Sequence, residues 1–259
     1  MIVERYDAFL FDLDGVLYRG DSPVPHAAAS LTRLRSLGKG VAFVTNNSGR
    51  PPGRVAERLR AVGVEASPDE VETSALTTAS ILAGRGVGRV FVVGEDGLVG
   101  ALTDAGVEVV LGEPDAVEAV VVGWDRAADY AKLRTASALV QRGAALVATN
   151  PDPSFPAADG TAWPGAGALL AAIETTTGVR GEVIGKPFPP VLQAALARAG
   201  GGRPLLVGDR IDTDIAGAAG LGWDSMLVLT GISTREDLPS SPVRPTYVAD
   251  DLRALFTEG

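Results

Sequence analysis

Residues 8–15 of the chain read AFLFDLDG, four apolar residues followed by a segment that contains two aspartates and a glycine. An apolar run of this length that ends at a turn signal is typical of a strand buried on both faces of a parallel sheet. Ligands of such sheets bind beyond the carboxyl ends of the strands, so Asp12 and Asp14 stand where functional side chains are expected. The stretch predicts an α/β fold with a site at this strand end.

Two other apolar runs end in polar side chains in the same way. The run VAFV leads into Thr45 and Asn46, and the run LLV leads through a glycine into Asp209, with Asp214 close behind. Polar residues end many strands merely to form turns, so one such end carries little weight on its own. Three together predict that these side chains converge at one edge of a sheet.

A cluster of carboxylates at that edge requires a cation. Like charges brought together repel and take up protons unless a positive ion neutralises them. Ligands that are all oxygen suit a hard ion, and Mg²⁺ is the natural candidate. Lys186, in the segment VIGKP, supplies an ammonium group. Carboxylates, a cation, a lysine and a hydroxyl are suited to phosphoryl transfer, in which the protein mainly positions groups and stabilises charge.

Outward from these strand ends, short apolar runs alternate with segments of helical period, and glycine closes several of the helices. This alternation predicts a doubly wound, mostly parallel α/β architecture. The expected strands are 8–11, 41–44, 90–93, 117–122, 144–148 and 205–207. The expected helices are 26–37, 51–62, 97–105, 129–142, 167–177, 190–199 and 214–219.

The interval between Thr45 and Lys186 is far longer than one crossover connection needs, so we expect it to contain an inserted domain. The core domain is expected to consist of residues 1–78 and 183–259. A smaller α/β cap is expected at residues 79–182, where it would close over the site and limit the size of the ligand.

Composition disfavours several other chemistries. The chain of 259 residues has no cysteine and a single histidine, so thiolate nucleophiles, zinc sites and histidine-rich metal sites are not expected. A net charge of −9 disfavours nucleic acid and anionic membranes as partners. The N-terminal segment lacks the features of a signal peptide, and no run reaches the ~18 apolar residues of a membrane span. We therefore expect a cytoplasmic protein with a small-molecule ligand.

The segments FDLDGVLYRG, VTNNS, VIGKP and VGDRIDTDIAGA occur in that order. They resemble the four motifs of haloacid dehalogenase-like (HAD) phosphatases. The long insert between the second and third segments is similar to that of the type IIA capped branch, whose members include p-nitrophenylphosphatase-like, phosphoglycolate-phosphatase-like and glycerol-phosphate-phosphatase-like proteins. The resemblance covers nearly the whole chain. None of the departures from the usual pattern falls in the catalytic set; they are His26, Trp124, Trp163 and Phe188.

The resemblance implies a role for each motif residue. Asp12 is the nucleophile and a magnesium ligand. Asp14 is the general acid–base, and its backbone carbonyl also binds the ion. Thr45 and Lys186 hold the phosphoryl oxygens, and Asn46 orients the phospho group. An aspartate is ionised at neutral pH, so the nucleophile needs no activating base.

Two further aspartates complete the implied site. Asp209 is the carboxylate ligand of magnesium, and Asp214 supports the water shell of the ion. In this family the insert often faces the substrate. The expected contacts with a small phosphate ester lie in one segment of the insert, residues 150–163, and they are Asp152, Phe155 and Trp163. The family also contains dimers formed through the cap, which leaves a homodimer open.

Three alternative functions stay open. A phosphomutase or other phosphotransferase uses the same fold, and release of inorganic phosphate would separate a hydrolase from it. A phospho-acceptor signalling domain also clusters carboxylates with a threonine and a lysine, but it needs neither a second domain nor a second acid at the D-x-D spacing. A non-catalytic binding protein is disfavoured because every catalytic position holds a competent residue. The motifs do not identify the physiological ester.

Overall fold

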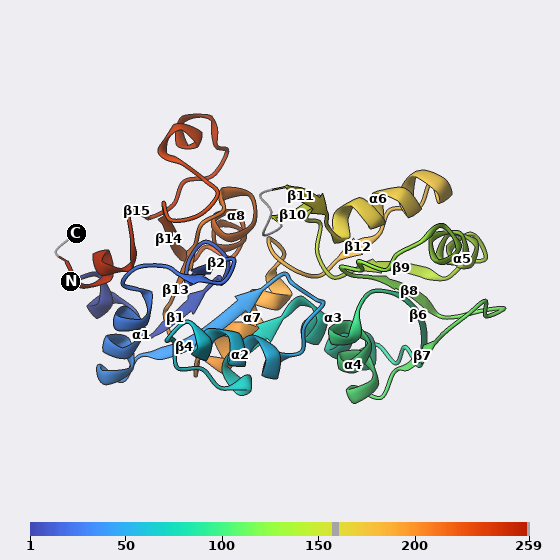
Figure 1. The fold of residues 1–259 in the computed structure, drawn as a ribbon, viewed down its shortest axis with the longest axis horizontal. Helices are drawn as coiled ribbons and strands as arrows, with labels where there is room; N and C mark the ends of the chain where they lie inside the picture. Colours follow the sequence, from blue (N-terminus) through green and yellow to red (C-terminus); the bar gives the residue numbers. More distant parts are fainter. Residues whose placement is uncertain (157–160, 258–259) are drawn as a thin grey trace. The chain divides into compact units, whose positions relative to one another are not determined.

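The computed structural model describes residues 1–156 and 161–257. Positions 157–160 of the segment in which ester contacts are expected therefore lie outside the described residues. The chain divides into two compact units, each with its own sheet (Figure 1). Unit 1 consists of Met1–Thr45, Pro52–Glu72 and Lys186–Gly259, and unit 2 consists of Asn46–Pro51 and Thr73–Gly185.

Unit 1 is built on a six-stranded sheet with the order β15-β14-β13-β1-β4-β5. Its strands are β1 (Ala8–Phe11), β4 (Gly40–Thr45), β5 (Val71–Thr73), β13 (Pro204–Gly208), β14 (Asp224–Val228) and β15 (Tyr247–Ala249). β1 pairs in parallel with β4 on one side and with β13 on the other. The chain thus runs outward from β1 first in one direction and later in the other, which is a doubly wound topology with its switch point at β1.

Helices cover both faces of this sheet. They are α1 (Ala27–Ser36), α2 (Pro52–Ala61), α7 (Pro189–Arg198) and α8 (Ala216–Gly220). Side chains alternate along β1, so Phe9 and Phe11 enter a core shared with α1 and α2. Ala8 and Leu10 enter a second core shared with α7 and α8. Burial on both faces explains why β1 is apolar throughout.

Unit 2 has a five-stranded sheet with the order β12-β9-β8-β6-β7, in which every neighbouring pair is parallel. Its strands are β6 (Arg89–Val93), β7 (Glu108–Val110), β8 (Ala119–Val122), β9 (Ala145–Ala148) and β12 (Glu182–Val183). Its helices are α3 (Ser74–Gly84), α4 (Asp96–Asp104), α5 (Tyr130–Gln141) and α6 (Ala166–Thr177). α3 and α4 bury Leu82 and Leu98 in one core, and α5 and α6 bury Leu139 and Ile173 in another.

The remaining elements are short. Unit 2 carries an antiparallel hairpin of β10 (Ser154–Pro156) and β11 (Ala162–Pro164), and unit 1 carries one of β2 (Tyr18–Arg19) and β3 (Ser22–Pro23). The 3-10 helices are η1 (Ile2–Arg5), η2 (Pro68–Glu70), η4 (Arg235–Ser240) and η5 (Leu252–Phe256), and η3 (Ile211–Ile215) is a π-helical turn. Only Asp209 and Arg210 separate η3 from the end of β13.

The fold class expected from the sequence is confirmed, and each expected strand or helix overlaps an element of the same type. The sequence does not predict α3. This helix reads SALTTASILAG, and its small and apolar residues form no stripe of helical period. The domain boundaries expected at 78/79 and 182/183 fall inside α3 and β12, and both of these elements pack within unit 2.

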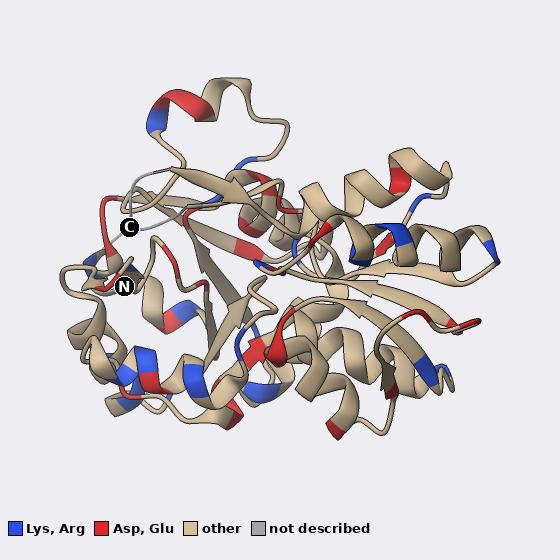
Figure 2. Cartoon of the chain, turned by 45° about the vertical axis from the view of Figure 1, so that its right-hand side comes forward, with Lys and Arg blue, Asp and Glu red and all other residues tan. Residues whose placement is uncertain are grey.

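Charged residues are distributed over both units. Lys and Arg positions lie scattered among Asp and Glu positions along the chain (Figure 2). Since the net charge is −9, an anionic ligand must be attracted by local groups rather than by the overall field. Within the described ranges, no helix combines the length and the apolar character needed to cross a membrane.

Candidate active site

Three carboxylates expected to act together lie at the carboxyl edge of the unit 1 sheet. Asp12 follows β1 directly, and its backbone N–H donates to the carbonyl of Val207 on β13 at 2.9 Å. Asp209 follows β13, and Asp214 lies in η3. All three are buried, and one carboxylate oxygen of each lies within 4.8 Å of those of the other two. The structure therefore brings these three residues together.

Lys186 is enclosed in the same cluster. Its Nζ donates hydrogen bonds to Asp12 Oδ1 at 2.6 Å and to Asp214 Oδ1 at 2.7 Å. The lysine is only 2% exposed, and an ammonium group buried to this extent needs anionic partners. A single ammonium does not balance three ionised carboxylates, so the cluster carries excess negative charge.

Burial and mutual repulsion raise the pKa values of these carboxyl groups. Burial is the main cause of the raised pKa of Asp12, although Lys186 acts against the rise. Burial, together with the charges of Asp12 and Asp214, raises the pKa of Asp209 to about 8. Burial also raises the pKa of Asp214 to about 6. Without a cation, the cluster therefore holds protons near neutral pH.

The pKa of Lys186 moves in the direction that keeps it charged. Its burial acts to lower the pKa, but the negative charges of Asp12 and Asp214 outweigh burial and raise it. The ammonium form is therefore maintained over the whole range of ordinary pH. The site keeps a fixed positive charge beside the Asp12 carboxylate.

Asp209 has one carboxylate oxygen with a hydrogen-bond partner and one without. Oδ2 accepts from the backbone N–H of Ile232 at 2.7 Å. Oδ1 is buried and has no hydrogen-bond partner among the described residues. Buried polar atoms are nearly always paired, so an unpaired carboxylate oxygen points to an ion. The donor set, which consists of oxygens alone, fits a hard divalent cation such as Mg²⁺.

Two glycines allow the chain to close around Asp209. A Cβ added at Gly231 would lie 1.9 Å from Asp209 Oδ2, and one added at Gly15 would lie 2.4 Å from the same atom. Gly15 also has a φ of +83°, in the left-handed region that favours glycine. Thr230 Oγ1 donates to the carbonyl of Gly15 at 2.6 Å and joins the two loops. Sequence reasoning missed the loop around Gly231 because it acts through its backbone.

The two remaining catalytic candidates of unit 1 lie at the same edge of the sheet. Thr45 is the buried last residue of β4, which pairs with β1 so that Phe43 stands opposite Phe11. Asp14 is half-buried, and its charge contributes to the raised pKa of Asp12. Among the described residues, Asp14 is not one of the three clustered carboxylates, so it neighbours the cluster without joining it.

The candidate substrate contacts of unit 2 form a group of their own. Asn46 Nδ2 donates to Asp152 Oδ2 at 3.1 Å. Phe155 stacks on Trp124 with ring centroids 4.4 Å apart, so its ring packs within the unit. Trp163 stands opposite Phe155 in the β10–β11 hairpin and is 43% exposed. The exposed Trp163 is thus better placed than Phe155 to contact a ligand.

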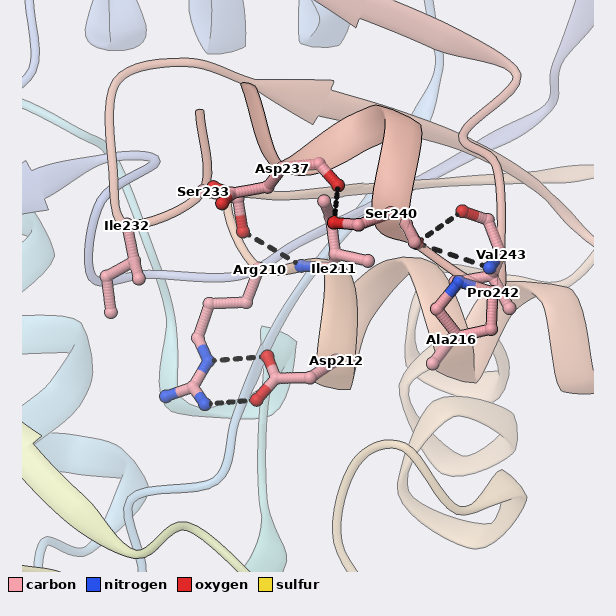
Figure 3. A pocket seen from close by; sticks show the side chains of 11 residues that line it. Arg210, Ile211, Asp212, Ala216, Ile232, Ser233, Asp237, Ser240, Pro242 and Val243 are labelled. Carbon is pink, nitrogen blue, oxygen red and sulfur yellow. Dashed lines mark hydrogen bonds and ion pairs between the residues drawn. The ribbon is translucent and has the colours of Figure 1, made fainter. Parts of the chain in front are cut away.

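A pocket of about 590 Å³ lies beside the loop that holds Asp209 (Figure 3). In the pocket wall, Arg210 and Asp212 form a two-point ion pair, with Nε to Oδ1 at 3.0 Å and Nη2 to Oδ2 at 2.6 Å. Ile232 lines the pocket through its side chain while its N–H binds Asp209. Its other lining residues are Ile211, Ala216, Ser233, Asp237, Ser240, Ser241, Pro242 and Val243, and none of the sequence-predicted site residues is among them.

Known proteins resemble this chain over its whole length. Residues 9–108 match a family model described as haloacid dehalogenase-like hydrolase, and residues 183–255 match one described as HAD-hydrolase-like. The acid sugar phosphatase of Staphylococcus epidermidis is 39% identical over 259 residues, which is 99% of each chain. The chain belongs to the haloacid dehalogenase-like hydrolases.

Solved structures place this HAD hydrolase in the phosphatase branch of the family. The glycerol phosphate phosphatase of Mycobacterium tuberculosis, solved in complex with magnesium, is 38% identical, with a TM-score of 0.92 over 98% of this chain and 77% of that chain. The p-nitrophenyl phosphatase of Archaeoglobus fulgidus is 35% identical, with a TM-score of 0.88 over 96% and 97%. The resemblance to type IIA HAD phosphatases that the four motifs indicate is therefore confirmed.

The raised pKa values predict how the stability of the metal-free HAD hydrolase depends on pH. Asp209 has a folded-state pKa of about 8 against an ordinary value of 3.8, so the folded protein binds a proton that the unfolded chain releases. The proton on Asp209 contributes its full stabilisation at pH values below the pKa of this carboxyl in the unfolded chain. This contribution is lost as the pH rises through the pKa of the same carboxyl in the folded protein. In EDTA, the free energy of unfolding should therefore decrease from about pH 4 to about pH 8.

Magnesium should remove this slope, because a bound cation stabilises the ionised carboxylates. Urea unfolding at several pH values, with EDTA and with magnesium, measures both slopes. Asp209→Asn is the control, since an amide does not titrate, and it should flatten the slope in EDTA. A metal-free protein that becomes more stable over this interval would contradict the pKa assignment.

Proposed function

We propose that this HAD phosphatase hydrolyses small phosphate monoesters, with Asp12 as nucleophile and Mg²⁺ as cofactor. The observation that carries the proposal is the buried cluster of three carboxylates and Lys186 at one sheet edge. The cluster combines an anionic nucleophile, a cation site and a fixed positive charge, and phosphoryl transfer uses all three. The relatives support this, because they are named acid sugar phosphatase, glycerol phosphate phosphatase and p-nitrophenyl phosphatase.

The cation site follows from the same residues. Asp12, Asp209 and the backbone carbonyl of Asp14 would hold the magnesium ion, and Asp214 would support its water shell. Oδ1 of Asp209, which is buried and has no hydrogen-bond partner in the described part of the chain, is a ligand atom of the right kind. When bound, the ion neutralises the negative charge that the carboxylates and the phosphoryl group bring together.

The reaction proceeds in two steps. The Asp12 carboxylate attacks phosphorus, and the bond to the leaving oxygen breaks as Asp14 gives that oxygen a proton. Asp14 then takes a proton from water, whose oxygen attacks the phosphorus of phospho-Asp12, releases inorganic phosphate and restores the carboxylate. Lys186 Nζ lies 2.6 Å from Asp12 Oδ1, so it is placed to contact the phosphoryl oxygens. Thr45, at the end of β4, provides a hydroxyl for the same purpose.

In this proposal, side chains of unit 2 contact the leaving group and select the ester. The names of the relatives favour one class of ester. Acid sugar phosphatase and glycerol phosphate phosphatase act on polyhydroxy esters by name, which favours a sugar or polyol phosphate here. Asn46 and Asp152, which are hydrogen-bonded to each other, offer polar groups suited to hydroxyls. A phosphomutase would pass the phosphoryl group to a second substrate, so release of inorganic phosphate distinguishes hydrolysis from transfer.

Asp12→Asn should abolish turnover and leave the fold intact. The amide has nearly the shape of the carboxylate but is a poor nucleophile, so no acyl phosphate should accumulate in a rapid-quench, single-turnover experiment. Circular dichroism provides the control for folding. Activity within about tenfold of wild type would remove Asp12 from the role of nucleophile.

Activity should be lost in excess EDTA and should return with magnesium. Calcium should restore little of it, because Ca²⁺ takes more ligands at longer distances and can bind the second oxygen of the nucleophile. Phosphate release at increasing concentrations of each ion is the measurement. Full activity in EDTA would contradict both the cofactor and the role assigned to Asp209.

Small sugar and polyol phosphates should be hydrolysed much faster than phosphoproteins or polyphosphates. Trp163→Ala should change the ranking among metabolite esters more than it changes the rate with p-nitrophenyl phosphate, because an activated leaving group depends less on recognition. Tyr130→Ala, which removes an aromatic ring that is 85% exposed in the same unit, is the matched control and should change neither. Rates that fall together with an unchanged ranking would show that Trp163 is structural.

A further inference from the structure

Thr149 and Asn150 follow β9 at the carboxyl edge of the unit 2 sheet. Both are buried, with 0% and 3% of their surfaces exposed. The N–H of Thr149 donates to the carbonyl of Val122 on the neighbouring strand β8 at 2.8 Å, so this pair is anchored to the sheet. Two polar side chains buried next to each other must be held by specific partners, and those partners are informative.

The backbone of Thr149 holds Gly185. The N–H of Gly185 donates to the carbonyl of Thr149 at 2.9 Å and continues the parallel pairing of β9 and β12. A Cβ added at Gly185 would lie 2.3 Å from that carbonyl oxygen and 2.6 Å from Asn46 Oδ1, so only glycine fits. The next residue of the chain is Lys186. The Ile184–Gly185 peptide, which ends at the residue before Lys186, is therefore fixed to Thr149.

The side chain of Asn150 holds Asn46. Asn150 Nδ2 donates to the backbone carbonyl of Asn46 at 2.7 Å, and Ser74 Oγ donates to the same carbonyl at 2.8 Å. Asn150 Oδ1 accepts from the N–H of Asp152 at 3.1 Å, so contacts at both ends of the amide set its orientation. The residue that precedes Asn46 is Thr45. The Asn46–Asn47 peptide, which begins at the residue after Thr45, is therefore fixed to Asn150.

We infer that the Thr149–Asn150 pair is a positioning element for phosphoryl transfer, an inference that rests on the proposed function. Thr45 and Lys186, the two residues assigned to the phosphoryl oxygens, lie 141 positions apart in the numbering and are each bonded to a residue that this pair fixes. The proposed mechanism assigns neither member of the pair a contact with the reacting atoms. Each acts through the backbone and limits how far its catalytic neighbour can shift.

Asn150→Asp tests the inference with little change of shape. The carboxylate keeps an acceptor for the N–H of Asp152 but replaces the donor to the carbonyl of Asn46. A shift of ~1 Å in catalytic groups lowers rates by up to about a hundredfold, so kcat should fall about ten- to a hundredfold. The factor should be the same for p-nitrophenyl phosphate and for metabolite esters, because the phosphoryl contacts are affected rather than the leaving group.

Gly185→Ala is the second variant, and the affinity for inorganic phosphate is the second measurement. The added methyl presses on the carbonyl of Thr149 and should reproduce the uniform loss of kcat. Calorimetric titration of inorganic phosphate in magnesium should show about tenfold weaker binding to both variants, about 1.4 kcal/mol. Leu139→Ala, which opens a cavity in a core of unit 2 at a residue that takes no part in the hydrogen bonds of the pair, is the matched control for lost stability and should keep wild-type kcat below its melting temperature.

Each outcome decides the inference. Folded variants of Asn150 and Gly185 that keep kcat and phosphate affinity within about threefold of wild type would overturn it. A changed ranking of esters with an unchanged p-nitrophenyl phosphate rate would also overturn it, because the pair would then recognise the leaving group. If the wild-type protein hydrolyses no ester, the proposed function is wrong. Titration of inorganic phosphate into wild type and variants still tests whether the pair positions the phosphate-binding residues.

Discussion

The site depends on the burial of several carboxylates around one ammonium group. Lys186 joins Asp12 to Asp214, and Asp209 lies within the same cluster with a buried oxygen that no described group satisfies. A buried ionic group of this kind seldom stabilises a fold more than apolar side chains would. The proposed reaction therefore accounts for the cluster better than a contribution to stability does, and the excess negative charge favours a cation at this site.

The parallel sheet is what brings these groups together. β1 is the switch point of the doubly wound topology, and β4 and β13 end beside it at the same edge. Apolar side chains on both faces hold the strands in register, so the first polar residue after each strand is placed with little freedom. Gly15 and Gly231 then let two loops approach Asp209 more closely than any residue with a Cβ could. A rigid core thus supports a site made of short strand extensions.

The sequence predicts the position of a functional candidate most reliably when its side chain comes directly after a recognisable buried strand. Asp12 and Asp209 follow buried strands, and a strand end is recognisable from the apolar run before it. The same reasoning missed Gly231, and it included Asn150 in the expected contact segment without its proposed positioning role, because these features depend on backbone geometry or on a hydrogen bond across 104 positions. Neither has a local signature. The expected boundary at 78/79 falls within α3, a helix that lacks the amphipathic period that marks a surface helix.

The chain passes between the two units at four places, so the insert cannot be exchanged between homologues as one continuous segment. Residues 46–51 belong to unit 2 although they follow β4 of unit 1 without interruption. An insert exchanged between two homologues at Thr73 and Gly185 would leave its six-residue partner segment behind in the recipient. The two pieces therefore form one structural module, in which the side chains of Asn46 and Asp152 depend on each other through their hydrogen bond.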